Sequence, residues 1–406
     1  MNSIKVETFD TSTGGDGGTY TLSNDVGDLT KAFIRNNNAT DKCSAGPSGN
    51  FGNLAPRTAH VGAQLTATDT ITFNQYDSTS NKLIGEVWRY TGPSGGDNEF
   101  IVRSHAAVAI TSGNTSASLA IAGIVDRNRC VPFMTGQENN ASSQSDHEKT
   151  TFAVHIDSSN NLVVSRNNAG TSVTATVYVE VVEFTGSNWS IGHGISTSHD
   201  SSTETVTLNT DSTGAGGSAF DVGDWDTAWI EGSFEGDTTE TGLADCIGFV
   251  HPHANTNQVY FSLIEADGAA RNDGDAYCHV IQHDDLDINR SLITNHPEGN
   301  NSYGTAISLP AGTSSSIDLT LCGLEWFVST NGTGTAHVRG RLGALLFDSG
   351  GGPFIKNWVH RSGNNIRIRY GVIDLTNITH TVVVPSLKPR KTRLKKRIDP
   401  RIDILL

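Results

Sequence analysis

A strand–turn–strand motif, with a large aromatic residue on each side of its turn, recurs along the sequence and limits what the chain can fold into. It reads GEVWRYTGPSGGDNEFIV at residues 85–102 and VYVEVVEFTGSNWSI at residues 177–191, with a looser copy, RLGALLFDSGGGPFIKNWV, at residues 341–359. The aromatic residues before the turn are Tyr90, Phe184 and Phe347, and those after it are Phe100, Trp189 and Phe354. Because large aromatic side chains dominate protein cores, we expect the three pre-turn residues to fill equivalent core positions.

The spacing of the strand candidates before the motif indicates tandem units rather than short solenoid turns. The pre-turn aromatic follows the middle strand candidate by 29 residues in the first unit (Val61 to Tyr90) and by 30 in the second. In the third unit the distance from Val280 to Phe347 is 67 residues, so this unit is expected to be an elaborated copy. The predicted divisions are an N-terminal arm at residues 1–18, units at 19–107, 108–197 and 198–365, closing strands at 366–385 and a basic tail at 386–406.

The composition favours strands over helices. Charged residues make up 17% of the chain, below the usual quarter, and Gly, Ser, Thr and Asn fill the deficit. No window of ten or more residues has a clear 3.6-residue period, whereas short alternating runs are bounded by turn clusters. We therefore predict an all-β chain of tandem antiparallel β-sandwich units, of jelly-roll or immunoglobulin-like type.

The cysteines and the first residues indicate where such a chain is made. Five cysteines are scattered without a CxxC pair, which is typical of free thiols in a reducing compartment. The opening sequence MNSIKVETFD has neither a basic nor an apolar signal region, and no run of eighteen apolar residues occurs. We expect no export and no membrane partner.

The last 21 residues differ in charge from the rest of the chain. Residues 386–406 hold eight of the 28 Lys and Arg and two of the 43 Asp and Glu, a net charge of +6, so the remaining residues carry −21. This tail also ends in an apolar tip, and we expect it to attach the acidic body to a partner. The candidate partner-binding residues are Lys388, Arg390, Lys391, Arg393, Lys395, Lys396, Arg397, Ile402, Ile404, Leu405 and Leu406. One alternative is that the tail binds nucleic acid, although the negative charge of the rest of the chain would repel it. The other is that the tail is disordered and only increases solubility.

No motif with mechanistic spacing predicts an enzyme, a cofactor or a metal site. His251 and His253 share a strand face, and His279 and His283 follow beside Cys278 and Asp284, but no second ligand pair has firm spacing. An Asp- and Asn-rich stretch at residues 267–275 lacks the spacing of a calcium loop and is better interpreted as a turn. Walker and HExxH motifs are absent. We expect no catalysis.

The phrases VEVVEFTGSNWSI and VWRYTGPSGGDNEFIV, on a low-charge background rich in Gly, Thr and Asn, resemble structural proteins of tailed bacteriophages. The resemblance is to the tandem β-sandwich proteins of tail fibres, head fibres and capsid decoration. It implies a non-enzymatic virion component that is assembled in the host cytoplasm, either an exterior protein associated with the tail or a fibre, or a capsid decoration or head-fibre protein. The partners it implies are other virion proteins and further copies of the chain.

Two other classes of protein stay open. A glycan-binding host-recognition protein would expose aromatic residues such as Trp88, Trp189 or Trp358 for sugar stacking, although core packing is the expected role of these residues. A cell-surface adhesin would need an export route.

Overall fold

The computed structural model describes residues 4–12, 15–36, 56–77, 82–168, 172–199, 203–214, 216–236, 248–263, 274–296, 302–303, 307–308, 320–330, 342–348, 353–359 and 366–374. Within these ranges the chain is mostly β, with 25 strands that pair antiparallel. The α-helix found there, α1 (Pro56–Ala59), has four residues. Short 3-10 turns complete the regular structure: η1 (Leu29–Lys31), η3 (Arg127–Arg129), η4 (Gln144–Lys149) and η5 (Trp225–Thr227). The predicted all-β class is confirmed, and no described helix is long and apolar enough to span a membrane.

One pairing rule accounts for these strands and repeats four times along the chain. In each group of six strands, the first and third flank the sixth in one three-stranded sheet, which we call the inner sheet. The second and fourth flank the fifth in another, the outer sheet. Repeat 1 consists of β1 (Ile4–Ser12), β2 (Thr19–Thr21), β3 (Ala32–Asn36), β4 (Gly62–Ala67), β5 (Thr70–Asn74) and β6 (Lys82–Tyr90).

The later repeats follow the same rule with different strand lengths. Repeat 2 consists of β7 (Ile101–Ile110), β8 (Ser116–Ala120), β9 (Cys130–Asn139), β10 (Ala153–Ile156), β11 (Asn161–Ser165) and β12 (Ala175–Glu183). Repeat 3 consists of β13 (Trp189–His199), β14 (Thr203–Thr207), β15 (Ala228–Phe234), β16 (Gly248–Pro252), β17 (Gln258–Leu263) and β18 (Gly274–His283). Repeat 4 consists of β19 (Asp287–His296), the two short strands β20 (Ser302–Tyr303) and β21 (Ile307–Ser308), then β22 (Thr320–Thr330), β23 (Leu342–Asp348), β24 (Pro353–Val359) and β25 (Ile366–Asp374). There β20 and β21 together take the second position, since both pair with β24.

Burial along the strands explains why two kinds of sheet form. In the outer sheets, β5 and β11 alternate between buried and partly exposed residues, as expected for a sheet with one face toward water. In the inner sheet of repeat 2, β12 (ATVYVEVVE) is buried at nearly every position. A strand that is buried on both faces needs an apolar partner on each side. The inner sheets therefore lie between two cores.

The first of these cores lies within each of repeats 1 to 3. In repeat 1, Phe9 and Ile34 of the inner sheet belong to one buried cluster with Leu65 and Phe73 of the outer sheet. Repeats 2 and 3 have equivalent clusters that join their own two sheets. The second core, the central cluster, is shared by the opposite faces of the inner sheets of repeats 1, 2 and 3, with Ile288 from β19 of repeat 4.

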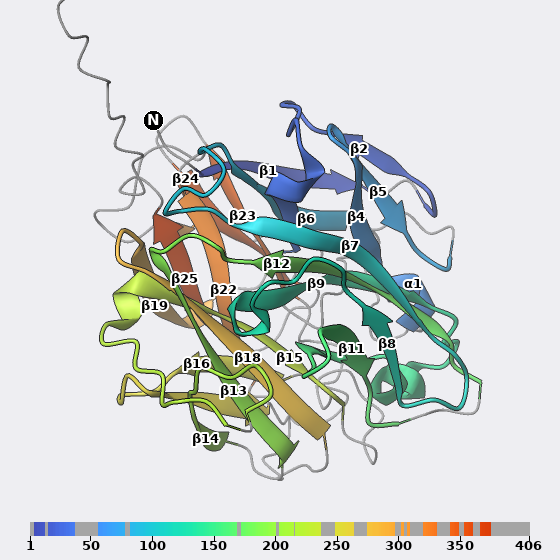
Figure 1. Cartoon of the computed structure of the whole chain (residues 1–406). Coiled ribbons are helices and arrows are strands. Elements are labelled where there is room, and N and C mark those ends of the chain that lie inside the picture. Colours follow the sequence, from blue (N-terminus) through green and yellow to red (C-terminus); the bar gives the residue numbers. More distant parts are fainter. Residues whose placement is uncertain are drawn as a thin grey trace, which may run out of the picture.

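The repeats are arranged in a closed ring around the central cluster. The fourth strand of each repeat contacts the inner sheet of the next: β4 contacts β9 and β12, β10 contacts β15 and β18, and β16 contacts β22. The fourth strand of repeat 4, β23, contacts β6 and β1 of repeat 1 and so closes the ring. Figure 1 shows this path, with the blue, teal, yellow-green and orange-red repeats following one another around the molecule.

The strand pairing gives four repeats where the sequence predicted three units. The long third spacing arises because Val280 lies in β18, the last strand of repeat 3, whereas Phe347 lies in β23, the fourth strand of repeat 4. The predicted boundaries at residues 107 and 197 fall inside β7 and β13. Within the predicted arm, β1 is paired along its whole length with β6. Residues 366–374 of the predicted closing segment form β25, and the rest of that segment lies outside the described residues.

Candidate functional site

The recurring sequence motif forms the junctions between repeats. Its two strands do not pair with each other, because the strand before the turn ends one inner sheet and the strand after it begins the next. Arg89 pairs with the first residue of β3, and Glu183 pairs with the first residue of β9. Tyr90 and Phe184 directly follow these two residues, so they occupy equivalent positions. Both are buried in the central cluster, as predicted. The prediction for Phe347 is wrong, because it pairs with Phe354 inside an outer sheet.

Three junctions meet at one buried amide, that of Asn98, in the loop between β6 and β7. Its Oδ1 accepts a hydrogen bond from Asn188 Nδ2 of the next junction at 2.7 Å. It also accepts one from His283 Nε2 of the third junction, again at 2.7 Å. The Nδ1 of His283 accepts the Asp285 backbone N–H at 3.0 Å, so the neutral ring satisfies both nitrogens. Burial lowers the pKa of His283, although Asp285 and Asp284 partly oppose the shift.

Aromatic rings fill the central cluster below the junctions. The ring centroids of Phe33 and Phe133 are 4.8 Å apart, and those of Trp88 and Trp229 are 4.9 Å apart. Trp189, 2% exposed, lies against Phe184 at 5.0 Å. These contacts connect repeats 1, 2 and 3. The expected core role is confirmed for Trp88 and Trp189, whereas the side chain of Trp358 lies outside the described residues.

A buried polar layer lies beside the aromatic rings, at one equivalent position in each of the first three inner sheets. In each of these sheets, one residue of the sixth strand pairs with the first residue of the third strand. The residue three positions before it is Glu86 in repeat 1, Glu180 in repeat 2 and His279 in repeat 3. All three are at most 3% exposed. Buried ionisable groups are costly unless they are paired, so each needs a partner. Their neighbours on the adjacent strands are Arg35, His105 and His193, respectively.

In repeat 2 the partner is His105. His105 Nδ1 pairs with Glu180, and His105 Nε2 donates to the Leu29 carbonyl of repeat 1 at 3.1 Å. Burial alone would lower the pKa of His105, but the Glu180 carboxylate and the Leu29 carbonyl outweigh it and raise the pKa. The hydrogen bond to Leu29 therefore joins the second inner sheet to the turn η1 of the first repeat.

In repeat 1 the layer reaches across the ring. Arg35 on β3 lies opposite Glu86 on β6, and its Nε forms an ion pair with Glu231 on β15 of repeat 3. The Arg35 and Glu231 side chains are 2% and 8% exposed. A carboxylate and a guanidinium that are removed from water depend on each other, so this pair fixes the distance between two repeats that are not neighbours in sequence.

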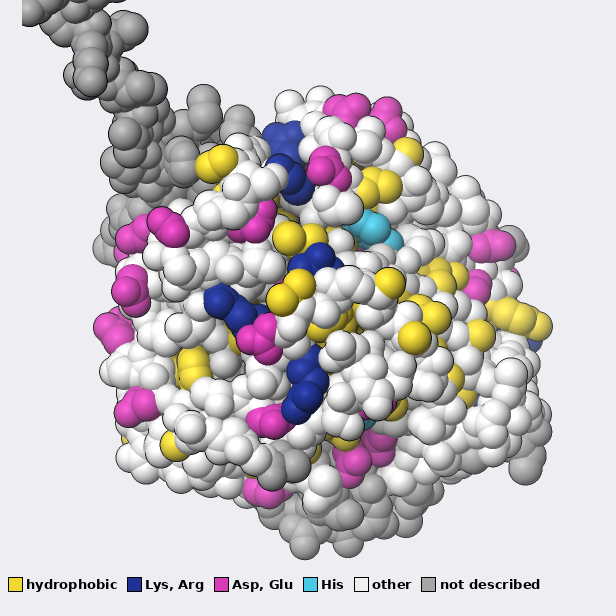
Figure 2. All heavy atoms as spheres, viewed as in Figure 1, with side chains coloured by type: hydrophobic (Ala, Val, Ile, Leu, Met, Phe, Trp, Pro, Cys, Tyr) yellow, Lys and Arg dark blue, Asp and Glu magenta, His cyan; other side chains and the backbone are white. Residues whose placement is uncertain are grey.

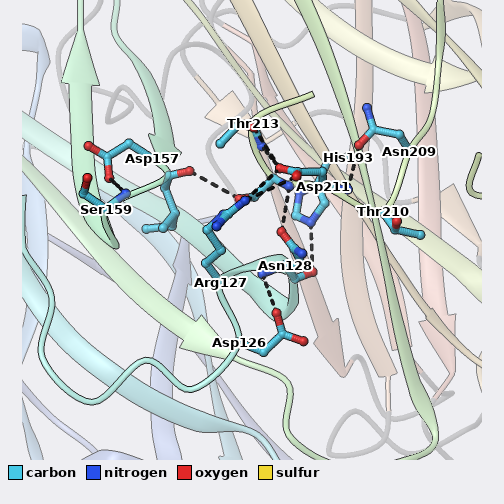
Figure 3. Close-up of polar contacts among 12 residues, drawn as sticks. Asp126, Arg127, Asn128, Asp157, Ser159, His193, Asn209, Thr210, Asp211 and Thr213 are labelled. Carbon is cyan, nitrogen blue, oxygen red and sulfur yellow. Dashed lines mark hydrogen bonds and ion pairs between the residues drawn. The ribbon is translucent and has the colours of Figure 1, made fainter. Parts of the chain in front are cut away.

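Between repeats 2 and 3 the polar residues form a seam, shown in Figure 3, which we define by Arg127, Asn128, His193, Asp211 and Ser212. Arg127 pairs with Asp211 at 3.2 Å, and Asn128 Oδ1 accepts the Ser212 backbone N–H at 3.1 Å. His193 Nε2 donates to the Asn128 carbonyl at 2.9 Å. Burial lowers the pKa of His193 to about 4, although this carbonyl and Asp211 oppose the shift. Chemically, the seam is a network of hydrogen bonds and one ion pair that connects two repeats.

The histidines that the sequence placed in one cluster are separated in the structure. His251 and His253 contact the ring of Tyr260 at 4.9 and 4.4 Å. His279 instead contacts His193, and His283 contacts Asn98. In the part of the chain that the structure describes, no group of three or more His, Cys, Asp or Glu residues is arranged to hold a metal ion. The predicted calcium-like stretch lies outside the described residues, except for Gly274 and Asp275 at the start of β18.

The predicted partner-binding residues of the tail, residues 388–406, all lie outside the described residues. Three aspartates that were not predicted from the sequence have the same role, one in each of repeats 1 to 3. Asp28, Asp126 and Asp224 each begin a 3-10 turn before the third strand, and each carboxylate accepts the backbone N–H two residues later, at 2.9 to 3.0 Å. They are spaced by 98 residues, which is the signal that would have revealed the true period.

No family model matches the chain, and no curated protein and no solved structure matches it either.

Proposed function

We propose that this chain is a non-enzymatic structural component of a phage virion, an exterior protein associated with the tail or a fibre and assembled in the host cytoplasm. The observation that carries the proposal is how the buried polar groups are used. His105, Arg35 and His193 each join one repeat to another, whereas an active site would direct such groups toward a substrate. A chain whose buried polar groups hold its repeats together is suited to a mechanical, structural role.

We infer that each repeat is a β-sandwich of the kind found in fibre and decoration proteins. The support is the shared core between the inner and outer sheets in repeats 1 to 3. Packing two antiparallel sheets face to face over one core is the defining feature of a sandwich. A decoration or head-fibre protein is the nearest alternative, because it would be built from the same kind of sandwich and would differ in its position on the particle.

We further propose that residues 386–406 attach this acidic body to an acidic neighbouring virion protein. Figure 2 shows isolated Lys and Arg side chains on the face viewed, most of them next to a carboxylate, and no broad basic patch there. Such a surface gives little attraction for nucleic acid, whose binding depends on many phosphate contacts. Burial of Trp88 and Trp189 removes two of the candidate sugar-stacking residues, which favours a structural role over glycan binding.

The experiment locates the chain on particles by electron microscopy and counts its copies per particle by mass spectrometry. Full-length chain, a version without residues 386–406, and a version with the tail lysines and arginines changed to glutamine are produced during infection. We expect the full chain at full occupancy and both altered chains to be folded, with unchanged melting temperature, but absent from particles. Absence of the full chain from purified particles contradicts the virion proposal, and full occupancy of the truncated chain contradicts the role of the tail.

A further inference from the structure

Three buried or half-buried histidines meet where repeat 2 contacts repeat 3. His193 on β13 and His279 on β18 are 0% and 3% exposed, and their Nδ1 atoms are 2.9 Å apart. His155 on β10 of repeat 2 stacks on Tyr277 of β18, with ring centroids 4.3 Å apart and planes 11° from parallel. The His193–His279 pair is tied to repeat 2 through the Asn128 carbonyl.

We propose that the contact between repeats 2 and 3 is an acid-labile joint, which opens when these three histidines take up protons. The joint consists of His155, His193, His279, Tyr277 and Asn128. This inference goes beyond the structural role proposed above and does not depend on the tail.

The hydrogen-bond pattern of the His193–His279 pair cannot hold a proton on all four ring nitrogens. His193 Nε2 donates to the Asn128 carbonyl at 2.9 Å, and His279 has a hydrogen bond with the Val154 backbone of repeat 2. The two Nδ1 atoms face each other at 2.9 Å, so one of them must donate and the other accept. Protonating both rings would place two N–H groups opposite each other at this distance. It would also set two positive charges against each other in a site closed to water.

The charged groups around the pair are already engaged. Toward His193, Asp211 pairs with Arg127, and Asp126 accepts the Asn128 backbone N–H. On β14, Glu204 accepts a hydrogen bond from Ser196. Opposite His279, Glu231 on β15 is paired with Arg35. No carboxylate facing the pair is therefore left to hold an imidazolium in place among the described residues.

His155 has carboxylates nearby, but they too have other contacts. Asp157 accepts backbone N–H groups from Ser159 and Asn161. Asp275 interacts with Tyr277, and Glu235 accepts the Asp275 backbone N–H. Burial lowers the pKa of His155, of His193 and of His279, and for His279 the two other histidines add to the shift. Closing the joint therefore expels protons that the open joint would bind.

The contact between repeats 1 and 2 has the opposite chemistry. His105 of repeat 2 donates there to the Leu29 carbonyl of repeat 1. The same imidazole pairs with Glu180 of its own repeat, and both interactions are strengthened when the ring is charged. Gln64 Nε2 also donates to the His105 carbonyl across this contact at 2.8 Å. Mild acid should therefore act on one contact in the ring and leave its neighbour closed.

The size of the effect follows from proton linkage. A histidine with a lowered pKa in the closed state favours opening once the pH falls below its free pKa of about 6.5, by up to about tenfold per pH unit for each proton taken up. For His193 this continues down to about pH 4. Between pH 6.5 and 4.5, His193 alone should increase opening about a hundredfold, with additional increases from His155 and His279.

Hydrogen exchange of the full chain tests the joint, because two backbone N–H groups bond across it. Val154 N–H donates to Ser233 Oγ of repeat 3 at 3.0 Å, and Ser212 N–H donates to Asn128 Oδ1 of repeat 2 at 3.1 Å. Phe73 N–H, bonded to the Gly18 carbonyl within repeat 1 at 2.8 Å, is the internal reference. Exchange is measured by mass spectrometry from pH 7.5 to 4.5, after correction for the intrinsic pH dependence of exchange. We expect Val154 and Ser212 to lose protection below about pH 6.5 while Phe73 keeps it.

Two variants assign the effect to the joint. His155→Phe preserves a stacked ring but removes one proton site, so the steepest possible pH dependence falls from three protons to two. His253→Gln changes a histidine outside the joint and should leave the curve unchanged. Both changes spare the central pair, so the test does not depend on replacing His193 or His279. Unchanged protection of Val154 and Ser212 down to pH 4.5, equal loss at Phe73, or a shift for His253→Gln as large as that for His155→Phe would each overturn the proposal.

Discussion

Arg35 and Glu231, 196 residues apart in the chain, form a buried ion pair that connects repeat 1 directly to repeat 3. Because neither group can regain water in the folded ring, Arg35→Met should lower the free energy of unfolding by about 3–5 kcal/mol. The double change Arg35→Met with Glu231→Leu should recover part of this loss, since the Glu231 carboxylate no longer lacks its cation, whereas Glu86 still loses its neighbour Arg35. Urea denaturation, followed by tryptophan fluorescence, measures both.

An exposed ion pair provides the control for that experiment. Arg57 and Asp77 are 3.9 Å apart, with side chains 40% and 33% exposed. Arg57→Met should change the free energy of unfolding by no more than about 1 kcal/mol. If Arg57→Met and Arg35→Met are equally destabilising, the buried pair has no special role in joining the repeats.

The three spaced aspartates should contribute equally. Asp28→Ala, Asp126→Ala and Asp224→Ala each remove the acceptor for one backbone N–H at the start of a 3-10 turn. Each should lower the free energy of unfolding by about 1 kcal/mol, the usual cost of losing such a cap. Chemical denaturation of the three variants side by side measures the cost. A loss confined to one aspartate would show that the turns are not equivalent.

The convergence of three junctions on Asn98 can be tested by shortening its side chain. Asn98→Ala leaves the donors of His283 and Asn188 without their acceptor and should destabilise the chain by about 1–3 kcal/mol. Asn188→Ala removes only one donor, on an exposed residue, and should have a smaller effect. Thermal unfolding at neutral pH compares the two variants. A larger decrease in melting temperature for Asn188→Ala would contradict the role of Asn98 as the shared acceptor of the junctions.

The loops of the first two junctions approach each other closely at Gly186, so replacing this glycine should cost more stability than replacing one in open space. A Cβ at Gly186 would lie 2.2 Å from the Asp97 carbonyl oxygen, whereas a Cβ at Gly216 would meet nothing within 4 Å. Gly186→Ala should therefore destabilise the chain by about 1–3 kcal/mol, as overpacking does, and Gly216→Ala should be nearly neutral. Melting temperatures of the two variants provide the measurement, and equal values would refute the close contact between these loops.

The two described free cysteines should be inert in the folded chain. Cys130 and Cys278 are both buried. Burial raises the pKa of the Cys130 thiol and raises that of Cys278 to about 12. Since the thiolate is the reacting species, iodoacetamide should leave both unmodified at pH 8 and label both after denaturation. Peptide mass spectrometry identifies the sites, and labelling of either cysteine in the native chain would contradict its burial.

The sequence was sufficient to predict the β class and the equivalence of Tyr90 and Phe184, because strand composition and aromatic burial are local signals. It misplaced Phe347, since a hairpin inside an outer sheet and a junction between repeats both appear as strand, aromatic, turn and strand. At the third junction the equivalent position holds His283 instead of an aromatic hydrocarbon, so the motif was not visible there.

The central polar groups could not be predicted from local patterns. His193 and His279 are 86 residues apart and become neighbours only through the pairing of β13 with β18. Arg35 meets Glu231 only because the ring brings the inner sheets of repeats 1 and 3 together. Such contacts depend on topology, which period and composition do not specify.

Closure of the ring by β23 has a consequence for biosynthesis. A ribosome delivers repeat 1 first, yet strands β1 and β6 contact β23, which begins at Leu342. Until repeats 2 and 3 follow, the nascent chain also carries Phe33 and Trp88 without their ring partners Phe133 and Trp229. Domains that emerge early and wait for distant partners are exposed to aggregation during translation. The order of synthesis therefore makes the first repeat the part of the chain most dependent on a chaperone.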